Sequence, residues 1–279
     1  MRLMGIVNVT PDSFSDGGLY RDAEAAIAHG LELAAEGADT VDVGGESTRP
    51  GAAAVGADEE RERTEPVVRA LAAAGHRVSI DTSKTAVAEA ALDAGAAVVN
   101  DVTAFVSDPD LAELCAGRGC EVVLMHMRGT PRTMQDEPRY DDVVEDVKAH
   151  LAERVEYAVA HGVEEERIWI DPGIGFGKTA QHNLELLRRL GELRELGRPI
   201  LIGTSRKSFL GKLTGRDVSG RIGGTVASNV LALMARADAF RVHDVAEVGR
   251  ALAAAEAILG RTDWGVDERF AGTASGQGG

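Results

Sequence analysis

The amino-acid sequence predicts an α/β protein built as one (β/α)8 barrel, and three observations support this. Short runs rich in Val, Ile and Leu alternate with segments of helical periodicity, which is typical of parallel strands buried on both faces and joined by right-handed crossovers. Eight such units follow one another, the number that a closed barrel needs. Each run also stops at a polar side chain, and a barrel gathers the carboxyl ends of its strands on one face.

The predicted strands come in order along the chain. They are residues 3–8, 41–46, 78–81, 97–101, 122–126, 168–171, 200–205 and 240–243. Their polar ends are, in the same order, Asn8, Glu46, Asp81, Asn100 with Asp101, His126, Asp171, Thr204 with Ser205, and His243. A polar residue after a strand can simply cap a helix or satisfy a turn, and we expect this of about half of them. The remaining polar strand ends predict a binding pocket at this face of the barrel.

Helices are predicted between the strands. Residues 22–37, 58–75, 83–95, 108–119 and 141–162 place apolar side chains three and four residues apart, and each segment ends at a glycine. An open, doubly wound sheet shows the same alternation and is the alternative fold. We expect residues 1–260 to form a single-domain TIM barrel. The tail, residues 261–279, has no periodicity and is predicted to be disordered.

Composition limits the location and the partners of the protein. The 279 residues are 44% hydrophobic, enough for one sizeable core. No apolar stretch approaches the roughly 20 residues of a membrane span, and the first strand starts almost at Met1, so we expect a cytoplasmic protein without a signal peptide. The two cysteines, Cys115 and Cys120, lack the spacing of a metal site and are expected to be free thiols.

The net charge of −15 argues against nucleic acid and anionic membranes as partners, because both need a basic surface. A small anionic substrate remains compatible if cations gather locally. Five cations fall in loops at predicted strand ends and are the candidates: Arg49, Lys178, Arg206, Lys207 and Arg241.

Three loops at predicted strand ends are candidates for a functional role. The first, residues 8–18, is long, and its one large apolar side chain, Phe14, suggests a lid, although Phe14 folded onto the barrel rim is an equal alternative. The second, residues 44–51, holds Arg49, which could bind a carboxylate or phosphate with both arms of its guanidinium, although an exposed surface arginine is equally common. The third, residues 171–179, is glycine-rich like an anion-binding loop, but Pro172 replaces the first glycine of a P-loop.

The predicted strand ends divide into two kinds of chemistry. Asp81, Asn100 and Asp171 offer two carboxylates and an amide, which match the donor and acceptor edge of an aminopyrimidinone ring. Residues 203–208 and 241–244 instead combine Ser, Arg, Lys and His near a helix N-terminus, which favours an anion, although pairing with neighbouring carboxylates would also explain these cations. Together the two sides suit a heterocycle that carries a phosphate leaving group.

Eight motifs in this order carry a resemblance to a known family. They are NVTPDSFSDGG, GGESTRPGA, SIDTSK, NDV, LMHMRGTPRTMQ, DPGIGFGKT, GTSRKSFLG and RVHDV. The chain resembles the dihydropteroate synthases of bacterial folate biosynthesis from about Leu3 to Gly260. The resemblance implies condensation of 6-hydroxymethyl-7,8-dihydropterin diphosphate with 4-aminobenzoate, giving 7,8-dihydropteroate and pyrophosphate, with Mg2+ as cofactor and a homodimer formed through helices late in the barrel.

The resemblance also implies residue roles. The pterin site would comprise Asp81, Asn100, Val102, Met125, Asp171, Phe176, Gly203 and Lys207. Arg241, His243 and Asn8 would take the diphosphate, Asn8 through Mg2+, while Phe14, Thr48, Arg49, Pro50, Ser205 and Ser208 would shape the aminobenzoate site. In a dissociative substitution, pyrophosphate leaves before the amine attacks, and the catalytic side chains would be Asp16, Asp81, Asp171, Lys207, Arg241 and His243.

Alternative functions remain at this stage. A pterin-binding barrel of the methyltetrahydrofolate methyltransferase kind shares the Asp/Asn/Asp set but does not need STRPG, SRK or RVHD. A catalytically idle pterin-binding paralogue would show losses in the first two loops, and both are complete here. Lys207 as the Schiff-base lysine of an aldolase is a further alternative. The segment after DPG lacks the Phe-containing insertion of sulfonamide-resistant relatives, so we expect inhibition by sulfonamides.

Overall fold

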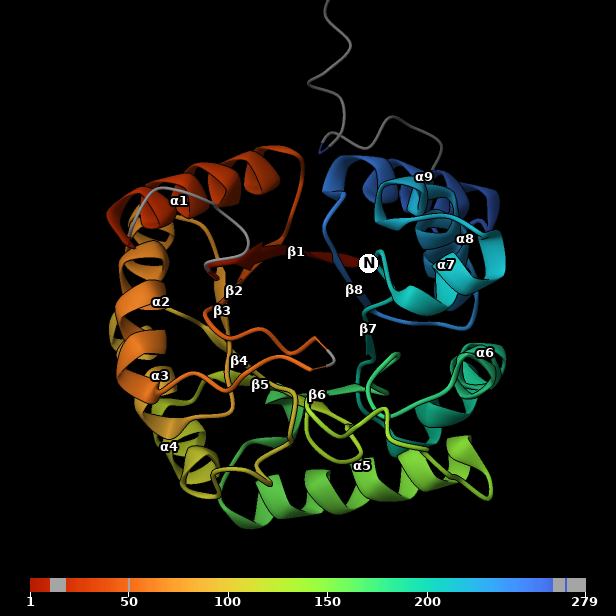
Figure 1. Ribbon diagram of the computed structural model, residues 1–279, viewed down its shortest axis with the longest axis horizontal. Coiled ribbons are helices and arrows are strands. Elements are labelled where there is room, and N and C mark those ends of the chain that lie inside the picture. Colours follow the sequence, from red (N-terminus) through yellow and green to blue (C-terminus); the bar gives the residue numbers. More distant parts are fainter. Residues whose placement is uncertain (11–18, 50, 263–268, 270–279) are drawn as a thin grey trace, which may run out of the picture.

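Eight parallel strands form a barrel, and the helices form a ring outside it (Figure 1). The computed structural model describes residues 1–10, 19–49, 51–262 and 269. The strands are β1 (Arg2–Asn8), β2 (Thr40–Gly44), β3 (Val78–Asp81), β4 (Val98–Asp101), β5 (Glu121–Met125), β6 (Ile168–Asp171), β7 (Leu201–Ile202) and β8 (Ala239–Val242).

The barrel closes at two places that join distant parts of the chain. The strand order is β6-β5-β4-β3-β2-β1-β8-β7, so the first strand pairs with the last. Between β6 and β7 the closure consists of a bridge between Ile170 and Ile200, with the Ile170 N–H donating to the Pro199 carbonyl at 3.0 Å. The predicted barrel is confirmed, and an open doubly wound sheet is wrong because these two edges meet. Strand β7 is shorter than predicted, since residues 203–205 already form the turn before the next helix.

The predicted helices are confirmed with ends within three residues. The α-helices are α1 (Leu19–Ala35), α2 (Ala57–Ala73), α3 (Thr85–Asp93), α4 (Asp110–Arg118), α5 (Val143–Ala160), α6 (Ala180–Arg188), α7 (Ser208–Thr214), α8 (Ile222–Met234) and α9 (Val245–Ile258). Short 3-10 helices are η1 (Glu165–Arg167), η2 (Leu190–Leu196) and η3 (Val218–Gly220). The glycine after each of the five predicted helices has a positive φ, between 60° and 109°, which explains why the helices stop there.

Side chains alternate between the outside and the inside of the barrel. Those that face outward pack against the helices in the large core, for example Leu3, Val43, Ile80 and Phe240. A separate small core fills the inside at the amino ends of the strands and consists of Met4, Val98, Val123, Trp169, Leu201 and Ala239. This apolar plug closes one end of the barrel, so the polar inner side chains belong to the other end.

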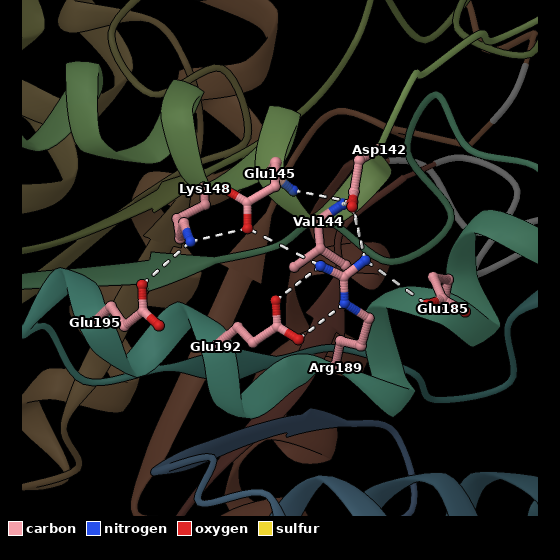
Figure 2. A network of polar contacts seen from close by, with 8 residues as sticks. All are labelled: Asp142, Val144, Glu145, Lys148, Glu185, Arg189, Glu192 and Glu195. Carbon is pink, nitrogen blue, oxygen red and sulfur yellow. Dashed lines mark hydrogen bonds and ion pairs between the residues drawn. The ribbon is translucent and has the colours of Figure 1, made fainter.

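The outer helices α5, α6 and η2 are linked by a network of ion pairs (Figure 2). Arg189 pairs with Asp142 at 2.9 Å and with Glu192 at 2.8 Å, and Lys148 bonds Glu145 at 3.0 Å and Glu195 at 3.2 Å. These groups are exposed to solvent, which screens their charges, so each pair contributes little to stability. In the part of the chain that the structure describes, no helix is long and apolar enough to cross a membrane.

Candidate active site

The inner side chains at the carboxyl ends of the strands form the candidate site. Strand register pairs Asp81 with Asn100, and Met125 with Asp171, near the carboxyl ends of their strands. Asp81, Asn100, Met125 and Asp171 are all buried. These four buried side chains therefore lie at the carboxyl ends of four neighbouring strands, and their binding of a pterin stays a prediction.

Arg241 connects three strands at the centre of this site. Its Nε donates to Asp42 Oδ2 at 2.6 Å and its Nη2 donates to Asp81 Oδ2 at 2.6 Å. The amide of Asn100 donates to the same oxygen of Asp42 at 3.1 Å. The cation thus offsets two carboxylates that burial would otherwise disfavour. Two of the N–H groups of Arg241 thus bind carboxylates of the protein itself. The predicted binding of a diphosphate would use its remaining N–H donors.

The two charges shift one another's pKa values. Burial raises the pKa of Asp81 to about 7, more than Arg241 lowers it, and Asp42 adds to the rise. Burial opposes the charge of Arg241, yet Asp42 and Asp81 hold its pKa above the usual value. Asp81 is therefore a carboxyl group that changes charge near neutral pH, in contact with a permanent cation.

Asp42 is a site residue that the sequence analysis missed. It lies on β2, two residues before the strand end, and its side chain is completely buried. Its Oδ1 has no hydrogen-bond partner among the described residues. The signal was available in the sequence, because side chains two apart on a strand share a face, so an Asp inside an apolar run points to the same interior as the strand end.

Asp171, Lys207 and Phe176 form the other half of the site. The Lys207 ammonium donates to the Ile174 carbonyl and lies 4.5 Å from the centre of the Phe176 ring. The N–H of Gly173 donates to Asp171 Oδ1 at 2.7 Å. Burial raises the pKa of Asp171, and burial lowers the pKa of Lys207 to about 8, while the attraction between the two groups opposes both shifts.

Gly203 separates the two cations of the site. A Cβ at this position would lie 3.8 Å from the Cβ of Arg241 and 3.9 Å from Nζ of Lys207. Both contacts are ordinary van der Waals distances, so a small side chain is not excluded by space alone. The position nevertheless lies between Lys207 and Arg241, as expected of a residue lining the predicted pterin site.

Ser205 and His243 contact each other beside Arg241. Ser205 Oγ accepts from the backbone N–H of His243 at 3.2 Å and lies 3.0 Å from its Nδ1. The hydroxyl either donates to Nδ1 or accepts from an Nδ1–H, depending on the tautomer of the ring. Burial and the nearby Arg241 lower the pKa of His243 to about 3, so the imidazole is neutral at pH 7.

Several predicted strand ends have structural roles instead. Asp101 accepts from the backbone N–H groups of Thr103 at 2.8 Å and Phe105 at 2.6 Å, and so caps the turn after β4. Thr204 accepts from the Ser228 hydroxyl at 2.8 Å. The expectation that about half of the polar ends satisfy local structure applies to these residues.

Lys178 is not available to an anion, contrary to the sequence prediction. It is 2% exposed, and its Nζ contacts His126 Nδ1 at 2.8 Å, the His126 carbonyl at 3.3 Å and the Phe176 carbonyl at 2.9 Å. Burial holds the pKa of Lys178 well below its usual value, and burial together with Lys178 lowers the pKa of His126 to about 2. Lys178 therefore fastens the loop 171–179 to the end of β5. Arg206 is likewise paired, with Asp244 at 3.0 Å.

The remaining candidates surround this centre. Val102 is buried after β4, Asn8 ends β1 and is partly buried, Thr48 is partly buried, and Arg49 and Ser208 are exposed. Phe14, Asp16 and Pro50 lie outside the described residues. Among the residues that are described, no group of three or more His, Cys, Asp or Glu side chains is arranged to hold a metal ion.

Comparisons with known proteins agree with one another. A family model described as "Pterin binding enzyme" matches residues 4–243. The dihydropteroate synthase of Mycobacterium leprae is 48% identical over 252 residues, which cover 88% of this chain and 89% of the relative, and that of Escherichia coli K12 is 44% identical over 258 residues, covering 92% and 91%.

Solved structures give the same result. Xanthomonas albilineans dihydropteroate synthase with 4-aminobenzoic acid superposes with a TM-score of 0.87 at 49% identity, covering 92% of this chain and 93% of the other. The Yersinia pestis enzyme in complex with a sulfonamide drug gives 0.88 at 43% identity, covering 93% and 94%.

Proposed function

This chain belongs to the pterin-binding enzyme family and functions as a dihydropteroate synthase, and we propose that the inner ends of its strands divide the two substrates between them. The reaction joins 6-hydroxymethyl-7,8-dihydropterin diphosphate to 4-aminobenzoate and releases pyrophosphate. One observation supports the proposal most: Asp81, Asn100, Asp171, Lys207 and Arg241 end or follow five different strands and meet inside one end of the barrel.

The pterin ring binds among the buried polar groups. Its adjacent N–H donors suit carboxylates, so Asp81 and Asp171 accept from the ring, and Asn100 and Lys207 contact its acceptor atoms. A buried carboxylate without a donor is costly, so the ring gains affinity by supplying donors that the protein does not. The apolar contacts come from Val102, Met125, Phe176 and the backbone at Gly203.

The diphosphate faces the cationic side. Arg241 has N–H donors beyond the two that bind Asp42 and Asp81, and we assign to the neutral His243 the tautomer with its proton on Nε2, where it can donate to the diphosphate. These groups stabilise the charge that develops on the leaving oxygen as the C–O bond breaks. Loss of one such donor typically costs about 2.7–4 kcal/mol of transition-state stabilisation.

The residues present fit a Mg2+ ion only if the diphosphate binds together with it and supplies oxygen ligands. Mg2+ takes oxygen ligands and is commonly held by one or two protein oxygens plus substrate phosphates. The side chain of Asn8 would supply one amide oxygen at the end of β1. Bound there, the ion would neutralise diphosphate charge, and Arg241 and His243 would still orient the leaving group.

The chemical step is a dissociative substitution. Pyrophosphate departs first, the pterin ring stabilises the resulting exocyclic cation, and the amine of aminobenzoate then attacks it. Asp171 and Asp81 favour the electron-deficient ring electrostatically, and Asp16 acts near the reacting carbon. Water must be kept out until the amine attacks.

Aminobenzoate binds on the outer side of the pterin. Arg49 and the hydroxyls of Thr48 and Ser208 provide donors for its carboxylate, Ser205 lies beside them in contact with His243, and Phe14 and Pro50 provide apolar surface. The structure of the Xanthomonas albilineans relative contains 4-aminobenzoic acid, and another of the same enzyme contains 7,8-dihydropteroate.

The test is release of pyrophosphate by the purified protein with Mg2+ and dihydropterin diphosphate, with and without 4-aminobenzoate. Release that depends on aminobenzoate, with one dihydropteroate formed per pyrophosphate, is expected. Pterin binding without turnover would instead identify an idle pterin-binding paralogue.

Sulfonamides are expected to inhibit by competing with aminobenzoate, since the Yersinia pestis relative was solved with such a drug. The measurement is the inhibition constant of a sulfonamide against varied 4-aminobenzoate. Competitive inhibition near the aminobenzoate KM is expected, and a constant far above that KM would contradict the proposed aminobenzoate site.

We further propose a homodimer and a cytoplasmic location. Of the ten large hydrophobic side chains that are exposed in the described residues, seven lie on or beside α7, α8 and α9, including Leu231, Met234 and Ile258. Covering them with a second copy would remove apolar surface from water. Cys115 and Cys120 are buried free thiols, as is usual in a reducing compartment. Sedimentation of the wild type and of a Leu231→Glu, Met234→Glu double variant tests the dimer.

A further inference from the structure

The loop that follows β2 begins directly against helix α2. A Cβ added to Gly45 would lie 2.8 Å from Thr64 Cγ2 and 2.9 Å from Glu60 Cγ, so the backbone of the loop touches the helix there. The Gly45 carbonyl also accepts from Nη1 of Arg63 at 3.1 Å. The residues that continue this loop are Thr48 and Arg49, which carry the proposed aminobenzoate contacts.

A partly buried ion cluster holds the next residue of the same loop. The Lys84 ammonium bonds both Glu46, in the loop, and Glu60, on α2. The Glu60 side chain is 1% exposed, whereas those of Lys84 and Glu46 are 25% and 23% exposed. Lys84 lies three residues after Asp81, at the N-cap of α3. Its ammonium therefore joins the loop after β2, helix α2 and the start of α3.

The burial of Glu60 distinguishes its ion pair with Lys84 from an ordinary surface ion pair. Among the described residues, Lys84 is the cation that bonds Glu60, and Glu60 Oε1 has no partner at all. Burial opposes the charge of Lys84, but its hydrogen bonds to Glu46 and Glu60 raise its pKa above the usual value. Removing one partner of a buried pair leaves the other charge uncompensated, which is far more costly than losing an exposed pair.

We propose that Lys84 is a positioning residue for the aminobenzoate side of the site: by joining Glu46 to Glu60 it fixes the start of the loop 45–49 without touching either substrate. The inference rests on the proposed function. It assigns to Lys84 a selective effect on the second substrate, because the loop that Lys84 holds follows β2, and β2 carries none of the proposed pterin contacts.

The test compares Lys84→Met with Lys148→Met. Lys148 also bonds two glutamates, at 3.0 Å and 3.2 Å, but it lies on α5, and those glutamates are 52% and 68% exposed (Figure 2). Lys84→Met is expected to raise the KM for 4-aminobenzoate about tenfold, with kcat and the pterin KM changed by less than about threefold. Lys148→Met should leave all three constants near wild type. Lys84→Arg, which keeps the charge, should restore most of the affinity.

Backbone hydrogen exchange supplies a readout that does not depend on activity. Exchange at residues 45–49 should be faster in Lys84→Met than in wild type and unchanged in Lys148→Met. If the wild type makes no dihydropteroate, the proposed function fails, and exchange still decides whether Lys84 fixes the loop. If Lys84→Met does not fold, Glu46→Gln replaces it, with a smaller rise in the same KM expected. Equal rises in both KM values, or unchanged exchange, would overturn the positioning role.

Discussion

Asp81 is a carboxyl group whose charge changes near neutral pH. Because burial raises its pKa to about 7, a proton leaves it between mildly acidic and mildly basic pH. The ionised form accepts N–H donors on both oxygens, whereas protonation turns one of these oxygens into a donor. The value of kcat/KM for dihydropterin diphosphate is therefore expected to rise with pH through about 7. A Asp81→Asn variant should be much less active and should lack this step in its pH profile.

The same shift has a consequence for folding. A carboxyl whose pKa is raised in the folded state favours folding while it is protonated, and this contribution is lost as pH rises from the unfolded value, 3.8, to about 7. Urea unfolding should therefore show Asp81→Asn gaining stability relative to wild type between about pH 4 and pH 7, and no further gain above that. A constant difference across this range would contradict the raised pKa.

Arg241 has both a structural and a catalytic role. Replacing it with Met leaves Asp42 and Asp81 buried without their cation, so we expect a loss of about 3–5 kcal/mol in the free energy of unfolding. Turnover should fall about 10²- to 10³-fold, because a donor to the leaving group is lost. Urea titration and pyrophosphate release measure the two effects.

A second variant separates these two roles. Adding Asp42→Asn to Arg241→Met removes one uncompensated charge and should restore part of the stability, while turnover stays low. If Arg241→Met alone kept turnover within a few-fold of wild type, Arg241 would have no role in leaving-group departure.

Individual side chains also show what sequence reasoning can reach. Asp81, Asn100 and Asp171 were predictable because each ends an apolar run, and a barrel gathers such ends. Asp42 was missed because it lies within its run, and Lys178 was misassigned because nothing in DPGIGFGKT reveals that its side chain turns inward to His126. Charge and spacing identify a loop with cations, but the direction of a side chain depends on the packing beneath the loop.

Among the structural elements, the loop 171–179 depends on glycines for its shape. Gly173 has φ +66°, and a Cβ there would lie 1.9 Å from the His126 carbonyl oxygen, where no side chain fits. The loop presents Phe176 and carries the carbonyl that Lys207 bonds. Its path close to the end of β5 therefore decides where one wall of the pterin site lies.

A matched pair of variants tests this. Gly197 also has φ +66°, but nothing lies within 4 Å of a Cβ there, so Gly197→Ala should cost only the backbone strain of about 1–2 kcal/mol. Gly173→Ala should cost more than that and should raise the KM for the pterin substrate. The checks are urea unfolding and initial rates. Equal effects of the two substitutions on stability and KM would show that the contact with His126 is unimportant.

All eight strands were predicted, seven of them with both ends within two residues of those in the structure. Apolar spacing and a final glycine gave helix ends within three residues, because both signals are local. Strand β7 was predicted over residues 200–205 but comprises only Leu201–Ile202. An apolar run shows which residues are buried, whereas the end of a strand depends on hydrogen bonds to neighbours that are distant in sequence.

Across the whole molecule, the two ends of the barrel have different tasks. The amino end is closed by the plug around Trp169, over which the guanidinium of Arg2 lies at 4.9 Å. The carboxyl end carries the charged groups. The division was predictable from the fold class, since barrels place catalysis at the carboxyl ends of their strands.

A substitution in the plug should therefore affect stability alone. Trp169→Ala is expected to cost about 3–5 kcal/mol in the free energy of unfolding, because a large buried side chain leaves a cavity. Both KM values should remain within about twofold of wild type at a temperature where the variant is folded. Chemical denaturation and steady-state kinetics measure this, and a selective change in either KM would show that the plug is coupled to the site.

The pairing of β1 with β8 also constrains how the protein folds during its synthesis. As the chain leaves the ribosome, β1 and β2 appear early, but the strand that completes the pairing of β1 appears only with residues 239–242. Asp42 cannot form its ion pair until Arg241, which is 199 residues further along the chain, has been synthesised. A nascent chain that lacks β8 thus exposes an unpaired strand edge and carboxylates without their cation, and is prone to aggregate or to bind chaperones. Strand β8 completes the pairing of β1 and brings Arg241 to the active site in a single event.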